Sequence, residues 1–182
     1  MKIRPIAMIE QLTEKLDSTS NPRHQKLLQN VIAHVSAEID GRDVNRILDT
    51  MVPEPQFHWY GMGYGDVGPK GREAVTAHYS KMLGERYHLH QHIFDTIMVD
   101  DNNVFLAGMI HIIFPGRVLK DMEFSVDDEK SAYAASYYSW ARFRFDDAGN
   151  CLGEDSFSDG MPITLERLTK LRPDEMPEQV KL

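Results

Sequence analysis

Histidines at alternating positions are the residues of this chain best suited to proton transfer. The segment YHLHQH, residues 87–92, has a histidine at every second position, and His111 follows beyond a DDNN turn. Alternate residues of a β-strand point to one face of the sheet, and a turn with two central residues pairs His92 with His111. We therefore expect His90, His92 and His111 to share a face. A one-residue bulge would separate them, because such a slip flips side chains to the other face.

Three kinds of site fit this cluster. In the first, the histidines are partly buried and their ring nitrogens bond the backbone or carboxylates. In the second they bind a metal ion, because His-x-His on one strand with a histidine on its neighbour is a known ligand pattern. The acidic ligand that usually follows is not obvious, since Asp95 points to the other face. In the third they act as acids and bases, because the unperturbed pKa of imidazole lies near neutral pH.

Helices are predicted in the first half of the chain. The clearest begins at Pro22 with Asn21 as its N-cap, and Gly41 supplies the left-handed residue that ends it. Its apolar positions recur at helical spacing and predict one buried face. A short helix capped by Asp43 follows, and a third helix is predicted over residues 72–83.

The second half predicts two β-hairpins. Residues 87–99 and 104–114 flank the DDNN turn, and residues 131–145 and 151–159 flank a DDAGN turn. A short aromatic strand, QFHWYG, precedes them. The charged connection between the hairpins is long enough to form a lid or an interface, and TLERLTKL predicts a short helix after the sheet. Helices followed by antiparallel strands are typical of the α+β class.

The length of 182 residues fits one domain with a single core. We expect a helical extension at 1–20, a single α+β domain at 21–172 and a polar tail at 173–182. No apolar run approaches the ~20 residues that span a bilayer, so no membrane segment is expected.

Charge and cysteine content restrict the partners and the compartment. The chain has 20 Lys and Arg against 28 Asp and Glu, a formal charge of −8 that disfavours nucleic acid as a partner. Its one cysteine, Cys151, forms no internal disulfide and suits a reducing compartment. We therefore expect a cytoplasmic protein.

Three runs within residues 24–160 resemble a known family. They are HVSAEIDGRDVNRILDTMVPEPQFHWYG, KGREAVTAHYSKML and the histidine-bearing strand that enters TIMVDDNN. Their order is similar to the SnoaL-like branch of the nuclear-transport-factor-2-like superfamily, which contains scytalone-dehydratase, polyketide-cyclase and diarylpropane-lyase types. The resemblance implies an α+β barrel in which a cone-shaped, curved antiparallel sheet wraps around N-terminal helices and encloses an apolar pocket. It also implies that no cofactor is used, and we expect no metal ion.

The same resemblance suggests four catalytic residues. AEIDGRDVNRI is similar to the dehydratase stretch whose aspartate orients a catalytic histidine, and the match falls on Asp40. The strand histidine of the family matches His90, with His92 two residues further on. His111 lies nearest to the second histidine of the family. Asp40 has an alternative role in capping the end of its helix.

Six residues are expected to contact the substrate. They are Trp59, Tyr60, Tyr79, Tyr138, Trp140 and Arg142. The pocket tyrosine of the family falls on Trp59, and the last three alternate along one strand face. Arg142 either binds an anionic group or forms an ion pair with Glu154 across the hairpin. Glu38, one turn after His34, is expected to form a solvated pair with it at the rim.

Together these features predict a cofactor-independent lyase, of a dehydratase or a retro-aldol, deformylating type. It would act by general acid/base catalysis on a hydrophobic, hydroxylated small molecule with an aromatic ring. The alternatives are an isomerase or cyclase for a polyketide or steroid-like substrate, a metal-dependent enzyme using the histidines, and a non-catalytic ligand-binding module. A homo-oligomer, dimer or trimer, is expected to form through an apolar outer sheet face. That face would contain Ile93, Ile97, Ile110 and Ile112.

Overall fold

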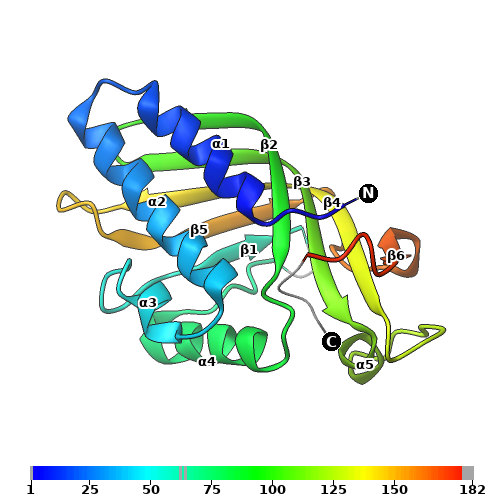
Figure 1. The fold of residues 1–182 in the computed structure, drawn as a ribbon. Helices are drawn as coiled ribbons and strands as arrows, with labels where there is room; N and C mark the ends of the chain where they lie inside the picture. The colour runs from blue at the N-terminus through cyan, green and yellow to red at the C-terminus, as the bar shows by residue number, and fades with distance from the viewer. Residues whose placement is uncertain (1, 62, 64, 178–182) are drawn as a thin grey trace.

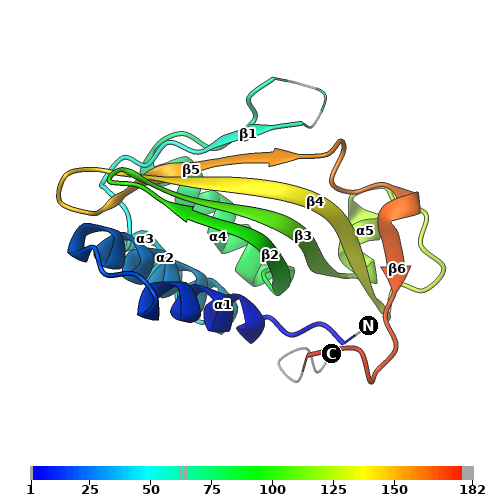
Figure 2. The same ribbon diagram turned by 90° about the horizontal axis from the view of Figure 1, so that it is seen from above.

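A layer of helices covers one face of a curved six-stranded sheet (Figures 1 and 2). The computed structural model describes residues 2–61, 63 and 65–177. The helices are α1 (Ile6–Asp17), α2 (Pro22–Asp40), α3 (Val44–Leu48), α4 (Gly71–Gly84), α5 (Gly116–Asp121) and the 3₁₀ helix η1 (Leu165–Arg167). The strands are β1 (His58–Tyr60), β2 (His90–Val99), β3 (Asn103–Pro115), β4 (Ala132–Phe145), β5 (Cys151–Ser158) and β6 (Leu168–Lys170). The predicted α+β class and curved sheet are confirmed.

The sheet has the strand order β1-β5-β4-β3-β2, and β6 pairs with β4 outside this path. Strands β2 to β5 are antiparallel, as the two predicted hairpins require, and β1 runs parallel to β5. The short helix predicted from TLERLTKL is only partly right, because that segment forms the 3₁₀ helix η1 and then β6. The cause is an open edge: β5 pairs with β4 only from Ser139 onward, so β6 pairs with the free edge at residues 133–135.

Helix α2 begins and ends where its sequence predicts. The side chain of Asn21 accepts hydrogen bonds from the amides of Arg23 and His24, and Gly41 adopts the left-handed conformation with φ of 63°. Its buried face includes Leu28 and packs into the main core, so the helix lies directly over the concave side of the sheet. Over the described part of the chain, no helix is long and apolar enough to cross a membrane.

Both chain ends pack against the body of the fold. Met8 and Leu12 of α1 are fully buried in the same core as α2. The amide of Ile3 donates to the carbonyl of Glu175 at 3.1 Å, which joins the first residues to the start of the predicted tail. Residues 178–182 of that tail lie outside the described residues.

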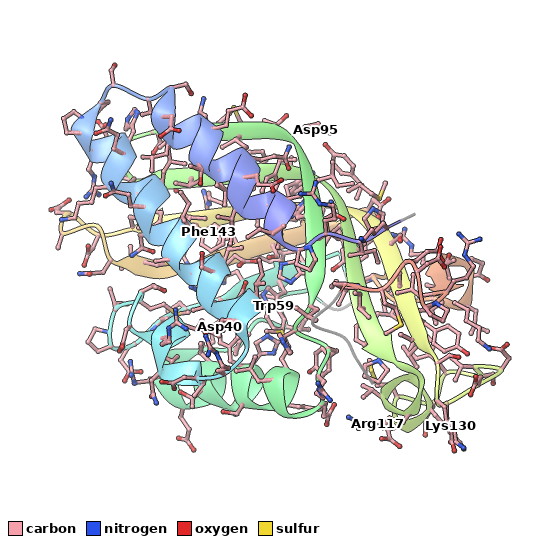
Figure 3. The ribbon with its side chains drawn as sticks, in the orientation of Figure 1. Asp40, Trp59, Asp95, Arg117, Lys130 and Phe143 are labelled. Atoms are coloured by element: carbon pink, nitrogen blue, oxygen red, sulfur yellow. The ribbon has the colours of Figure 1, made fainter. Side chains whose placement is uncertain are left out.

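The connection between the hairpins folds against the far end of the sheet. Val118 and Leu119 of α5 are buried beside Phe114 and Tyr133, and this packing anchors the segment. Met122, just after α5, lines the cavity described below. Figure 3 places Arg117 at this end of the molecule, away from the helix layer.

A β-bulge decides which residues of β2 and β3 share a face. Next to the turn the register is the predicted one, with Thr96 opposite Ala107. Beyond Asp95 the register shifts by one residue, so that His92 lies opposite Ile110 and not opposite His111. The prediction that His92 and His111 share a face is therefore wrong. Asp95 lies where β2 bends (Figure 3).

Substitution at Gly108, which faces the bulge, tests this geometry. A Cβ added there would lie 1.9 Å from the carbonyl oxygen of Ile93, and backbone cannot move away as a side chain can. We predict that Gly108→Ala lowers the free energy of unfolding by about 1–3 kcal/mol, measured by urea denaturation. Gly84→Ala is the control, because no atom lies within 4 Å of its added Cβ and alanine favours a helix. Equal stability of the two variants would contradict the close approach of the bulged backbone to Gly108.

Candidate active site

The concave face of the sheet and the helix layer enclose a cavity of about 380 Å³. Most of its wall is apolar, with Phe94, Leu106 and Ile110 among the side chains from the sheet. The charged side chains that line it are Glu38 from α2, Glu154 from β5, and Lys81 and Glu85 at the end of α4. An apolar cavity with a few convergent polar groups is typical of a small-molecule site.

Glu38 and His34 form a buried pair at this cavity. Glu38 is 9% exposed and His34 is 1% exposed. The Nε2 atom of His34 lies 3.5 Å from Oε1 of Glu38 and 3.0 Å from the hydroxyl oxygen of Tyr79 on α4. The two residues share a helix face because they are four positions apart. The prediction of a solvated rim pair is therefore wrong.

Thr50 fixes the position of one proton on His34. The hydroxyl of Thr50 donates to the carbonyl of Ile47 at 2.7 Å, so its oxygen is left to accept from Nδ1 of His34 at 2.9 Å. Nδ1 therefore carries a hydrogen, and Nε2 is the nitrogen that faces Glu38 and Tyr79. This arrangement holds the imidazole ring in one orientation.

The surroundings of Glu38 favour its ionised form. Burial raises the pKa of Glu38, but attraction to His34 and a hydrogen bond from it lower the pKa further, with help from His90 and the Tyr79 hydroxyl. The resulting pKa is about 2. Burial, and then the charge of Glu38, raise the pKa of Tyr79, which therefore stays a hydroxyl. Glu38 is thus a carboxylate at neutral pH within a largely apolar cavity.

His90 and His92 of β2 both face the cavity, but a different ring nitrogen is hydrogen-bonded in each. Nδ1 of His90 donates to the carbonyl of His88 at 3.1 Å, which leaves Nε2 as the nitrogen able to accept a proton. Nε2 of His92 donates to the carbonyl of Gly108 at 3.2 Å. Burial lowers the pKa of His92 to about 4, so this ring is neutral at physiological pH. His90 is therefore the better placed of the two to act as a base.

Glu154 enters the cavity from β5, on the side of the sheet where Phe143 contacts His34. The hydroxyl of Ser156 donates a short hydrogen bond to its Oε1 atom. Burial is the main cause that raises the pKa of Glu154, and the charge of Glu38 adds to it. The cavity therefore holds one carboxyl group with a lowered pKa and one with a raised pKa.

Aromatic side chains shape the rest of the wall. Trp59 packs on His78 with ring centroids 4.8 Å apart, and His78 packs on Tyr79 at 5.2 Å. Tyr137 reaches the cavity from β4, and burial raises the pKa of its hydroxyl, which therefore remains protonated. Flat rings around a polar centre suit an aromatic ligand.

Four of the residues predicted for the site line the cavity. They are His90, His92, Trp59 and Tyr79. The structure brings them together with the carboxyl groups of Glu38 and Glu154. Their assigned roles in catalysis or substrate binding stay predictions.

Two of the predicted catalytic residues lie elsewhere. The bulge turns His111 to the outer face, where Nδ1 lies 2.8 Å from the hydroxyl of Ser136. Asp40 lies at the end of α2 (Figure 3) and pairs with Arg42 and Arg46 outside the cavity. Both assignments to this cavity are corrected, since Glu38, two residues before Asp40, supplies the carboxylate that faces it.

The remaining predicted contacts lie on the outer face as well. Tyr60 and Trp140 pack against Phe157 there, with ring centroids 4.7 and 4.3 Å away. Tyr138 bonds Asp95 at 2.9 Å. None of these three side chains lines the cavity.

Arg142 pairs with Asp155 and not with Glu154. Its Nε atom lies 3.0 Å from Oδ2 of Asp155, and Arg144 binds the other oxygen at 2.9 Å. The predicted pairing fails because a second register shift, just beyond the turn of this hairpin, places Arg142 opposite Asp155. The same shift turns Glu154 inward.

Several polar residues of the cavity were not predicted as site residues, among them Glu38, His78, Tyr137 and Glu154. A signal for Glu38 was present, because His34 and Glu38 continue the apolar stripe of α2 and a residue on that stripe is buried. No comparable signal existed for Glu154 and Tyr137, whose direction depends on the register of the hairpins.

The expected apolar patch for self-association is only partly formed. Ile93 is 43% exposed on the outer face, together with Met109 and Trp140. Ile110 and Ile112 instead line the cavity, and Ile97 packs against the main core. The bulge again causes the difference. The oligomeric state stays a prediction.

The three-histidine metal site does not form, because His111 lies on the opposite face from His90 and His92. Within residues 2–61, 63 and 65–177, no group of three His, Cys, Asp or Glu side chains is arranged to hold a metal ion.

Solved structures share this fold at low sequence identity. A SnoaL-like polyketide cyclase from a Jannaschia species matches with a TM-score of 0.56 and 14% identity, over 78% of this chain and 91% of its own. An NTF2-like protein from Anabaena variabilis matches with a TM-score of 0.54 and 12% identity, over 79% and 96%. The epoxide hydrolase/cyclase-like enzyme SalBIII, which has a role in pyran ring formation in salinomycin, matches with a TM-score of 0.54 and 11% identity, over 81% and 97%.

These likenesses establish the fold shared by SnoaL-like and NTF2-like proteins, as the sequence resemblance implies. No protein-family model and no curated protein matches the sequence.

The lowered pKa of Glu38 makes stability depend on pH. A carboxyl whose folded pKa lies below its unfolded value stabilises the fold above the unfolded pKa and loses that effect as pH falls through the folded pKa. For Glu38 this window runs from 4.5 to about 2. We predict that the wild type exceeds Glu38→Gln in free energy of unfolding by about 3 kcal/mol at neutral pH, and that urea denaturation shows this gap shrinking below pH 4.5.

Asp40→Asn is the matched control, because it removes a carboxylate from the same helix outside the cavity. Its difference from the wild type should be much smaller at every pH, because Arg42 and Arg46, which lower the pKa of Asp40, are exposed to solvent. A difference in free energy of unfolding between the wild type and Glu38→Gln that stays constant from neutral pH to pH 3 would contradict the lowered pKa of Glu38.

Proposed function

We propose that this cavity is the active site of a cofactor-independent lyase that uses general acid/base catalysis. Its substrate would be a hydrophobic, hydroxylated small molecule with an aromatic ring, and the reaction a dehydration or a retro-aldol cleavage such as deformylation. The observation that carries the proposal is the carboxylate of Glu38 in the same cavity as His90, an imidazole whose charge interacts with it and whose Nδ1 donates to the backbone, which leaves Nε2 to accept a proton.

His90 suits the role of the base better than Glu38 does. A carboxylate with a pKa of about 2 binds a proton weakly, whereas an imidazole accepts one readily near neutral pH. The negative charge of Glu38 would stabilise the imidazolium that His90 forms, as the carboxylate does in other catalytic dyads. His34 and Tyr79 hold Glu38 in place for this role.

Both lyase reactions need one base and one proton donor. In a dehydration, the base removes a proton next to a carbonyl, and the hydroxyl on the following carbon takes up a proton and leaves as water. In a retro-aldol cleavage, the base removes the hydroxyl proton, a carbonyl forms at that carbon as the carbon–carbon bond breaks, and the enolate that is released takes up a proton. The largely apolar wall lowers the local dielectric and so strengthens the interaction between Glu38 and the developing positive charge.

The alternative is an isomerase or a cyclase for a polyketide or steroid-like substrate. It is favoured by the descriptions of similar structures, which name polyketide cyclases and an epoxide hydrolase/cyclase-like enzyme. The same base would serve there, because enolisation next to a carbonyl also begins an isomerisation or a ring closure.

The aldol adduct of acetone and benzaldehyde is a suitable probe, because its dehydration gives benzalacetone and its cleavage returns benzaldehyde. Both products absorb in the ultraviolet and separate by chromatography. We predict that His90→Gln lowers kcat/KM for this probe by about 100-fold or more, since the base is lost.

His111→Gln is the control, because the same residue type is replaced in the neighbouring strand on the opposite face of the sheet. It should turn over the probe at the wild-type rate. Full activity of His90→Gln, or an equal loss of activity in both variants, would contradict the role of His90 as the base. Saturable binding of benzalacetone by the wild type with no turnover would instead indicate a ligand-binding module.

A further inference from the structure

Glu154 is a partly buried carboxyl group with no role in proton abstraction by His90. It lies opposite Phe143 in the sheet and faces the cavity, while the next residue, Asp155, faces the other side of the sheet. Asp155 is the more deeply buried of the two, at 6% exposed, but it lies outside the cavity. Their comparison shows what the cavity does to a carboxyl group.

The two side chains differ in their partners. Asp155 binds both Arg142 and Arg144, which neutralise its charge. Glu154 accepts a hydrogen bond from the hydroxyl of Ser156, and in the described part of the chain neither a lysine nor an arginine forms an ion pair with it. A carboxyl group that faces a largely apolar cavity without a paired cation is more stable in its neutral form.

The groups around Glu154 strengthen this preference. Those that interact with its charge are His34 and Glu38 from α2, Tyr79 from α4, His90 from β2, Tyr137 from β4 and Cys151 from β5. Glu38 is an anion and repels a second one, while the tyrosines and the cysteine are neutral. The two histidines favour ionisation, but burial outweighs them and the pKa of Glu154 is raised.

We propose that Glu154 is the proton donor of this cavity and that it protonates the oxygen that leaves the substrate. The proposal rests on the proposed lyase function and adds a catalytic residue to it. Two acids whose environments differ in this way divide the roles of charge stabiliser and proton donor. Glu38 supports the base and Glu154 completes the departure of the leaving group.

For the aldol probe the step balances as follows. His90 takes the proton from the carbon next to the carbonyl, and the electron pair of that C–H bond forms the carbon–carbon double bond. The bond from the next carbon to its hydroxyl oxygen breaks, and Glu154 gives its proton to that oxygen, which leaves as water. The imidazolium of His90 then returns a proton to Glu154 after product release.

Two substrates with different leaving groups separate proton donation from a structural role. The aldol adduct must lose hydroxide unless it is protonated, whereas its acetate ester loses acetate without protonation. We expect Glu154→Gln to lower kcat for the adduct by about 100-fold with little change in KM, and to keep activity on the ester within a few-fold of wild type. Glutamine preserves the size of the side chain and the bond from Ser156 but has no proton to transfer.

His90→Gln is the matched comparison, because elimination from either substrate needs the base. It should lose activity on both. An equal loss on both substrates in Glu154→Gln would overturn the proposal, and so would full activity on the adduct. Circular dichroism of Glu154→Gln and of Glu154→Asp, which retains a transferable proton, shows whether the fold is kept.

A measurement without turnover distinguishes this proposal from the lyase function itself. Infrared difference spectra between the wild type and Glu154→Gln at neutral pH should show the carbonyl band of a protonated carboxylic acid. A carboxylate band in its place would overturn the proposal even if the enzyme is a lyase. If the wild type converts neither substrate, the lyase function fails and the catalytic role of Glu154 fails with it, whatever the infrared band shows.

Discussion

The contact between Glu38 and His34 sets the chemistry of the whole cavity. A carboxylate enclosed by apolar side chains is costly unless a hydrogen-bonded partner stabilises its charge. Helix α2 supplies that partner one turn away, and Thr50 and Tyr79 fix the ring that makes the contact. Because Glu38 stays ionised, nearby groups respond to a fixed negative charge.

The same charge separates the roles of the groups around it. Burial is the main cause that raises the pKa of Glu154, and repulsion from Glu38 raises it further. Burial likewise comes before the charge of Glu38 in raising the pKa of Tyr79, which stays a hydroxyl and donates to Glu38. Glu38 and Glu154 are thus held in opposite charge states in one largely apolar cavity.

Sequence patterns were sufficient for the fold and insufficient for the site. The cap at Asn21, the stop at Gly41 and both hairpin turns are local signals, and the structure has each of them. The direction of strand side chains depends on bulges, which no local pattern marked. In each hairpin the register next to the turn was predicted correctly, and one extra residue then turned His111 outward and Glu154 inward.

Carbon-13 NMR of labelled glutamate side chains measures directly whether Glu38 remains ionised inside the cavity. The carboxyl signal that disappears in Glu38→Gln identifies the residue. This signal should keep its carboxylate shift well below pH 4.5 and approach its midpoint near pH 2. A midpoint at or above 4.5 would contradict the lowered pKa, because Glu38 would then lack the stabilisation attributed to His34.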